Sequence, residues 1–157
     1  MEKLLEISTT KFAPSERISK SEIEYQHDIV EDFLPLKPFV DEVDHMFVVF
    51  NKERQIVYAN KLFLSFVGTN EIVSQRFGET LNCINSSLET GGCGTSENCR
   101  ECGAVNSILN SIKKGLDQQE CRITAINNKV FDFKFWTKTI RIQNSDYVMA
   151  SITDISN

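Results

Sequence analysis

Hydrophobic and polar positions change their spacing along the chain, and the first half divides into a helical part followed by a β-hairpin. From Ser21 onward apolar residues recur at helical spacing, and Ser21 with Glu24 resembles a capping box. The residues that can share the apolar face of this helix are Ile23, Val30, Phe33 and Leu34. Residues 46–50 and 55–59 are rich in β-branched and aromatic side chains and flank the polar segment 51–54, which predicts two strands joined by a turn.

Short helical segments lie on either side of this hairpin. Pro35 and Pro38 interrupt the first helix, and a second short helix is expected at Phe39–Val43. After the hairpin, Asn60 is a good N-cap because its side chain can accept a hydrogen bond from the first turn of a helix. The sequence therefore predicts a short helix at Lys61–Phe66.

The second half of the chain is typical of one longer helix followed by three strands. Apolar spacing predicts a helix from Cys102 to Lys114. The apolar stripe on this helix consists of Ala104, Val105, Ile108, Leu109 and Ile112. Residues 121–126, 130–140 and 147–155 have the composition and alternation of strands. Together with the hairpin they predict a five-stranded antiparallel sheet with helices on one side, an α+β domain.

Side chains alternate between the two faces of the strand expected at residues 130–140. The aromatic residues on one face are Phe131, Phe133 and Phe135. We expect them to belong to the hydrophobic core, with the wall of an organic-ligand pocket as the alternative. Trp136 falls on the opposite face beside Lys134 and Lys138, and this face is expected to receive the N-terminal helix or a second subunit.

Length and composition limit the class of protein. The 157 residues suffice for one domain, and 41% hydrophobic with 25% charged residues is typical of a globular fold. The net charge of −5 argues against nucleic acid or an anionic membrane surface as the main partner. No apolar run is long enough to span a bilayer, and the N-terminus lacks a signal-peptide core. The expected compartment is the cytoplasm, where thiols stay reduced.

Four of the five cysteines lie close together in sequence, at Cys83, Cys93, Cys99 and Cys102. Thiols grouped in this way bind a soft metal, carry an iron–sulfur cluster or alternate between thiol and disulfide. The spacing of Cys99 and Cys102 allows two thiolates from one turn to bind the same ion at about 2.3 Å. Neither histidine lies near these cysteines in the sequence, so four thiolates are favoured over mixed ligands.

The neighbours of these cysteines fit a bound group. Cys102 begins the predicted helix, whose positive dipole end favours a thiolate. Gly94 and Gly103 allow tight turns and close approach of the backbone around such a group. Cys121, at the start of a strand, is expected to be a buried core residue and is only a second-tier candidate ligand.

The residues alone leave several chemistries open. Zinc and iron–sulfur clusters both accept four thiolates, and a reversible disulfide could join Cys99 to Cys102 or Cys83 to Cys93. A catalytic cysteine is the least favoured alternative, because it requires a strongly lowered thiol pKa and no base lies near in the sequence.

Two stretches of the sequence resemble a PAS domain. Residues 48–68 are similar to the opening hairpin and short helix of such domains, and Asp154-Ile155-Ser156 is similar to their terminal motif. The likeness covers residues 40–156. Within it, the segments around Cys83, Cys93, Cys99-Arg-Glu-Cys102-Gly and Cys121 resemble a cysteine-bearing PAS subgroup that precedes the transmitter region of prokaryotic sensor histidine kinases, and Lys11–Pro14 resembles its leader.

The resemblance implies a sensory input module rather than an enzyme. It divides the chain into an N-terminal arm and helix, residues 1–40, and a PAS-like domain, residues 41–157, with a cysteine-rich insert at 78–104. We expect redox or gas sensing through a centre held by the four grouped cysteines, with an iron–sulfur cluster favoured because a sensor needs a group that responds to oxygen or electrons. A zinc-stabilised dimerisation module or a thiol–disulfide switch is the alternative.

The resemblance also implies partners and a path for the signal. The N-terminal helical region, residues 21–43, is expected to form a homodimer, and a histidine kinase transmitter region or partner protein is expected to receive the signal. A change at Cys102 is expected to shift the helix that follows it and to reach the last strand at Asp154, where an output helix would attach.

Overall fold

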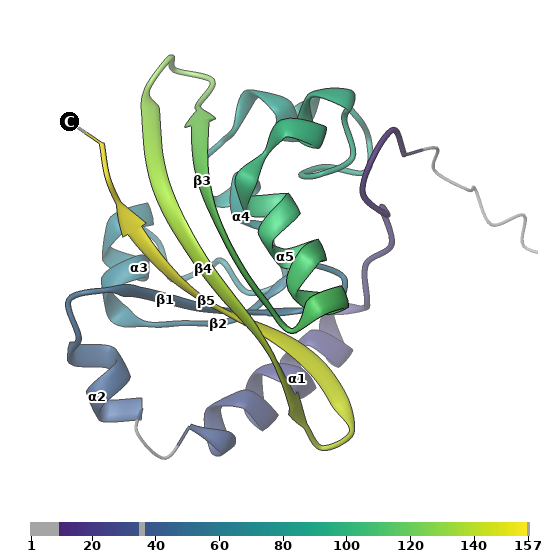
Figure 1. Cartoon of the computed structure of the whole chain (residues 1–157). Helices are drawn as coiled ribbons and strands as arrows, with labels where there is room; N and C mark the ends of the chain where they lie inside the picture. The colour runs from purple at the N-terminus through teal and green to yellow at the C-terminus, as the bar shows by residue number, and fades with distance from the viewer. Residues whose placement is uncertain (1–9, 35–36, 157) are drawn as a thin grey trace, which may run out of the picture.

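A five-stranded antiparallel sheet in the order β2-β1-β5-β4-β3 forms the centre of the protein in the computed structural model, which describes residues 10–34 and 37–156. The strands are β1 (Met46–Asn51), β2 (Ile56–Ala59), β3 (Leu116–Thr124), β4 (Val130–Ile142) and β5 (Ser145–Asp154). The helices are α1 (Lys20–Phe33), α2 (Lys37–Glu42), α3 (Lys61–Val67), α4 (Phe77–Thr80) and α5 (Gly103–Lys114), with short 3-10 helices at Ile84–Ser87 and Glu97–Glu101. Figure 1 shows the first strands beside the last one, as the pairing of β1 with β5 requires. The predicted α+β class and sheet are confirmed.

The main core lies between the sheet and helices α3, α4 and α5. Phe133 and Phe135 are fully buried, and the ring of Phe77 in α4 meets them edge-on at centroid distances of 5.5 and 4.8 Å. The buried residues that β5 contributes are Val148, Ala150 and Ile152. The aromatic face predicted for β4 is therefore core at Phe133 and Phe135, and Phe131 packs against its edge partly buried.

Helix α1 packs on the opposite face of the sheet. Its buried residues Ile23 and Val30 contact a second apolar cluster that includes Val49 and Tyr147, whose neighbours in sequence point into the main core. Trp136 shares this outer face but stays 41% exposed, since α1 packs mainly against β2. Helices α3 to α5 thus lie on one side of the sheet, as predicted. Helix α1, the predicted N-terminal extension, lies on the other side.

The start and the apolar face of α1 differ from the prediction. Its N-cap is Ser19, whose hydroxyl accepts a hydrogen bond from the Glu22 amide, so Ser21 lies inside the helix. Phe33 is 49% exposed because it lies about 80° around the helix axis from the buried Ile23, and its assignment to the buried face was wrong. Pro38 lies in the first turn of α2, where the missing amide hydrogen is tolerated, so it begins this helix rather than preceding it. The prediction for Pro35 lies outside the described residues.

Strand and helix bounds in the second half also differ in detail. β3 begins at Leu116 rather than Cys121 and pairs along its whole length with β4. The pattern missed its first residues because they alternate between exposed and half-buried positions without a strong apolar signal. Ile112 is exposed on α5, since it lies at the border of the apolar stripe. Within the described ranges, no helix combines the length and apolar character needed to cross a membrane.

A close backbone contact sets α5 against β3. A Cβ atom built on Gly103 would overlap the carbonyl group of Glu120. The first turn of α5 can therefore lie this near the strand only because residue 103 has no side chain. Gly103 thus serves this approach to the sheet, and its predicted role around a bound group stays a prediction.

We expect Gly103→Ala to destabilise the protein by about 3 kcal/mol, because the added methyl group meets backbone that cannot rotate away. Gly115→Ala is the matched control: Gly115 ends the same helix at a φ of +90° with open space around it, so only the left-handed conformation is penalised, by about 1 kcal/mol. Urea unfolding followed by circular dichroism measures both changes. Equal losses in the two variants would contradict the contact.

Candidate cysteine-lined site

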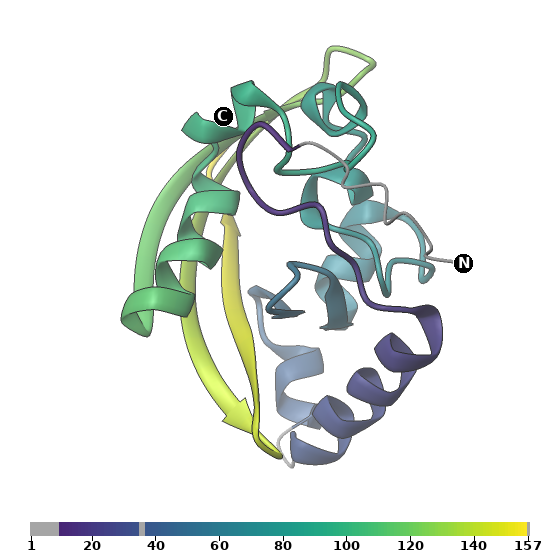
Figure 2. The ribbon, with the colours of Figure 1, turned by 90° about the vertical axis from the view of Figure 1, so that its right-hand side faces the viewer.

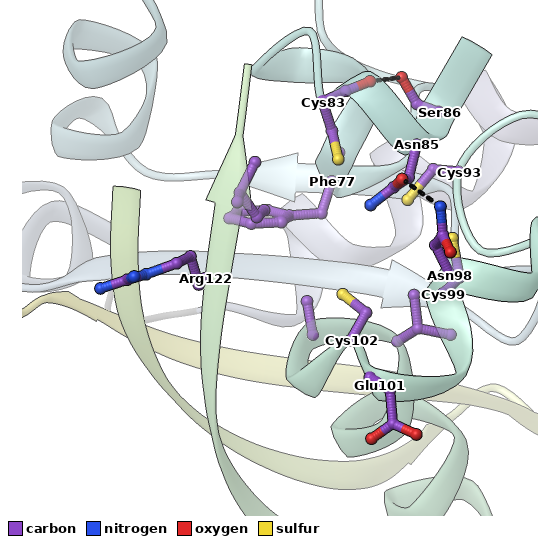
Figure 3. A pocket seen from close by; sticks show the side chains of 14 residues that line it. Phe77, Cys83, Asn85, Ser86, Cys93, Asn98, Cys99, Glu101, Cys102 and Arg122 are labelled. Atoms are coloured by element: carbon purple, nitrogen blue, oxygen red, sulfur yellow. Dashed lines mark hydrogen bonds between the residues drawn. The ribbon is translucent and has the colours of Figure 1, made fainter. Parts of the chain in front are cut away.

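The four grouped cysteines line a single cavity of about 150 Å³. They reach it from different segments: Cys83 follows α4, Cys93 lies in a glycine-rich loop, Cys99 lies in a 3-10 helix, and Cys102 is the N-cap of α5. Figure 3 shows the sulfur atoms of Cys83 and Cys102 pointing toward the space between them, with Cys93 and Cys99 along one side. Chain folding thus gathers the cysteines that the sequence singled out.

The backbone around Gly78 sets the spacing of two of these thiols. A Cβ atom at Gly78 would lie 3.0 Å from the Cys93 sulfur and 3.3 Å from Cβ of Cys83, so the glycine allows both side chains to approach. Across the cavity the side-chain amide of Asn98 donates a hydrogen bond to the side-chain oxygen of Asn85 at 3.2 Å. This bond links the segments that carry Cys99 and Cys83. The cavity walls are therefore held together by backbone packing and by polar contacts.

The distances between the sulfur atoms bear on what they can bind. Zinc–sulfur bonds of about 2.3 Å in a tetrahedron place the four sulfurs roughly 3.8 Å apart. In the described ranges, three metal-ligand atoms come within 4.8 Å of one another only at His27, Asp28 and Glu31 on the surface of α1. The cysteine sulfurs are therefore spread more widely than a single tetrahedral ion requires.

The sequence set Cys121 apart from the four grouped cysteines, but the structure places it next to one of them. It is buried in the main core, as expected, but its sulfur lies 3.6 Å from that of Cys102. The contact arises because β3 runs directly beside the first turn of α5. Since Cys121 lies on a strand, 19 residues after Cys102, no short spacing motif could have shown this pair.

The surroundings favour neutral thiols over thiolates at three positions. Burial raises the pKa of Cys83, and burial together with Cys102 raises the pKa of Cys93 to about 12. The thiols of Cys102 and Cys121 share a hydrogen bond, which raises the pKa of Cys102 and lowers that of Cys121. A metal would have to displace these protons, so binding would release acid and strengthen with pH.

Two buried arginines lie behind the cavity. Arg54 is 3% and Arg76 is 1% exposed, and both donate hydrogen bonds to the carbonyl oxygen of Cys93, at 3.1 and 3.4 Å. Burial lowers the pKa of both side chains, that of Arg76 to about 9, so Arg76 remains positively charged at neutral pH. Nε of Arg54 is buried and has no hydrogen-bond partner. These residues went unnoticed in the sequence, because isolated arginines are usually exposed.

Glu79 is a carboxylate at the centre of this charged group. It accepts hydrogen bonds from the Arg17 side chain and from the backbone amides of Arg76 and Cys93, each of the amides at 3.0 Å. Burial works against its charge, but these donors outweigh it and lower the pKa of Glu79. The buried guanidinium groups of Arg54 and Arg76, together with the partly exposed Arg17, thus outnumber the Glu79 carboxylate beside Cys93.

The N-terminal arm, residues 10–18, crosses the loop that carries Cys93. The amides of Lys11 and Ala13 donate to the carbonyl oxygens of Thr95 and Gly94, both at 2.9 Å. Arg76 donates to the Glu16 carbonyl oxygen at 2.8 Å. Figure 2 shows the arm running over the cysteine-bearing segment before it enters α1. The arm therefore connects this segment mechanically with α1; the part of the predicted arm before residue 10 lies outside the described residues.

Comparison with known proteins finds similarity at the level of structure. The PAS domain of nitrogen regulation protein NR(II) from Vibrio parahaemolyticus has a TM-score of 0.57 at 10% identity, covering 77% of this chain and 98% of that one. A PAS domain of an HTR-like protein from Haloarcula marismortui gives 0.53 at 11%, covering 80% and 99%. A PAS domain from a two-component sensor histidine kinase gives 0.54 at 8%, covering 80% and 97%. No family model and no curated protein sequence matches the chain.

We expect Glu79→Gln to destabilise the protein by about 2 kcal/mol at neutral pH, since a neutral amide replaces a charged acceptor of several hydrogen bonds. The lowered pKa of Glu79 means that the folded state favours the carboxylate, so this stabilisation is present above the ordinary pKa of 4.5 and is lost as the pH falls through the folded value. The gap in unfolding free energy between the two proteins should therefore narrow below pH 4.5. Unfolding titrations at a series of pH values measure it.

Glu97→Gln is the control for this experiment. Glu97 forms an exposed ion pair with Arg100, so its replacement should change the unfolding free energy by no more than about 0.5 kcal/mol. A gap for Glu79→Gln that stays constant from pH 7 to pH 3 would show that the charge of Glu79 does not contribute.

Proposed function

We propose that this chain, which has the PAS fold, is a sensory input domain in which Cys83, Cys93, Cys99 and Cys102 hold a soft-metal centre whose state is the signal. The observation that carries the proposal is the convergence of these four thiols, from four separate segments, on one cavity beside the buried guanidinium groups of Arg54 and Arg76. Inert core cysteines would need neither the shared cavity nor the charges.

The negative charge of such a centre would explain why the two arginines are buried. Placing a cation in the interior is unfavourable unless an opposite charge accompanies it. Metal centres with four thiolate ligands carry a net negative charge, and Arg54 lies near enough to Cys93 and Cys99 for their thiolates to raise its pKa. The arginines would therefore stabilise the thiolates of a filled site and hold the Cys93 loop in place.

An iron–sulfur cluster is the favoured occupant, with zinc as the alternative. The sulfur atoms are too widely spaced for direct closure on one ion, whereas a cluster of several iron and sulfide ions bridges a larger gap. Such a cluster supplies sensitivity to oxygen or electrons when bound. A zinc site requires the sulfurs to move closer together and would favour a dimerisation module without sensing.

Changes at the site have a defined route to the sheet. Cys102 begins α5, and α5 contacts β4 through buried hydrogen bonds: the Ser111 hydroxyl donates to Thr137 at 2.7 Å, and the Thr137 hydroxyl to the Ser107 carbonyl oxygen at 3.0 Å. β4 pairs with β5, which ends at Asp154. A shift of α5 would break these buried contacts or move the strands, so we place the output at Asp154.

The proposal includes partners. One structure similar to this chain is a PAS domain from a two-component sensor histidine kinase, which supports a kinase transmitter region or partner protein as the recipient of the signal. Tyr25 and Phe33 are large apolar residues exposed on α1, and they support a homodimer through this helix. We further propose that the chain acts in the reducing cytoplasm and has no catalytic activity of its own, since three of its thiols are shifted away from the reactive thiolate.

We expect protein purified without oxygen to contain iron and acid-labile sulfide and to show visible absorption that is lost on exposure to air. Replacing any of the four grouped cysteines with serine should reduce the iron content at least tenfold, whereas Cys121→Ser should retain it. Elemental analysis and absorption spectroscopy measure these outcomes. About one zinc per chain with unfolding on chelation would support the zinc alternative, and metal-free protein under all conditions would contradict both.

A further inference from the structure

Cys102 and Cys121 form a thiol pair that the four-ligand site does not explain. Their sulfur atoms lie 3.6 Å apart, against about 2.05 Å in a disulfide. Their backbones are held close independently of the side chains, because Gly103 packs directly on the carbonyl group of Glu120. The residues next to both cysteines are thus in contact, so only small side-chain rotations separate the thiols from bond formation.

The two thiols differ in their access to solvent. Cys102 is half-buried and lines the cavity, whereas Cys121 is buried beneath it in the core. A small oxidant that enters the cavity therefore meets Cys102 first. This order matches a pair in which one cysteine reacts with the oxidant and the other completes the disulfide.

We propose that Cys102 and Cys121 are a peroxide-sensitive disulfide site. Hydrogen peroxide oxidises one thiol of the pair to a sulfenic acid and is reduced to water. The other sulfur then attacks the oxidised sulfur, the S–S bond forms, and the sulfenic oxygen leaves as a second water molecule. Two thiols and one peroxide thus give one disulfide and two waters, and a dithiol reductant reverses the change.

The disulfide would remove Cys102 from the metal site; this consequence rests on the proposed function. A sulfur in a disulfide no longer has the thiolate charge that binds a soft metal. Oxidation would therefore leave three of the four ligands and hold the N-terminus of α5 to β3. The pair would act as a lock that keeps an emptied site from refilling until it is reduced.

The disulfide is tested on the whole chain after chelation without oxygen, with circular dichroism to verify that it is folded, by adding hydrogen peroxide at a low molar excess. We expect free thiols to fall from five to three per chain, and peptide mapping without reductant to find Cys102 joined to Cys121. Cys121→Ala has four thiols and should form no disulfide at the same peroxide dose. A principal Cys99–Cys102 or Cys83–Cys93 disulfide would overturn the inference.

A denatured sample provides the matched control. In the unfolded chain the pairing follows loop length, so Cys99 with Cys102 should predominate there. The same pairing in folded and denatured protein would show that the fold does not select Cys121. Metal reloading after oxidation is a separate measurement: if the disulfide forms but iron and zinc never bind even the reduced chain, the disulfide stands and the proposed function fails.

Discussion

The backbone of Gly103 lies against the carbonyl group of Glu120 with no room for a side chain between them. This contact fixes the start of α5 on β3, and with it the position of Cys102, which caps the helix. The cavity, the neighbouring thiol of Cys121 and the buried hydrogen bonds from α5 to Thr137 all follow from that placement. Moving the helix outward by the width of a methyl group would disturb each of them.

The second constraint is electrostatic. Arg54 and Arg76 occupy interior positions, and their hydrogen bonds go largely to backbone carbonyls of the arm and of the loop with Cys93. The Glu79 carboxylate accepts a hydrogen bond from the backbone amide of Cys93 in the same loop. A glycine-rich loop is thereby held in one conformation by charged groups, and the positive charge of the arginines favours an anionic occupant beside it. The arginines that hold the Cys93 loop in place are thus the same residues that would stabilise a negatively charged centre.

The arm and α5 give the site two connections to the rest of the molecule. α5 leads to the central strands through its buried serine contacts, and the arm leads to α1 on the other face of the sheet. Under the proposed function, a change at the cysteines would therefore reach both faces of the sheet. The Cys102–Cys121 pair lies at the joint between α5 and β3, where a covalent bond would alter the first of these connections most directly.

Local patterns were sufficient for much of the architecture. The alternation of Phe133 and Phe135 with Trp136, the hairpin around residues 51–54 and the N-cap at Asn60 depend on neighbours in sequence, so the residues themselves determined them. The candidate ligands could also be identified from the sequence, since cysteines grouped this closely rarely lack a common binding or redox role. Where the pattern failed, as at Ser21 and Phe33, two competing serines and a short apolar run left the start of the helix undetermined.

Tertiary structure alone decided the environment of those ligands. Arg54 and Arg76 look like surface residues in the sequence, and only the convergence of the arm, the hairpin turn and the cysteine loop buries them. Cys121 becomes a partner of Cys102 only because β3 passes beside α5. Sequence spacing reports which groups are near along the chain, whereas the charge, burial and pairing of a thiol depend on atoms brought near by folding, and these carry no local signal.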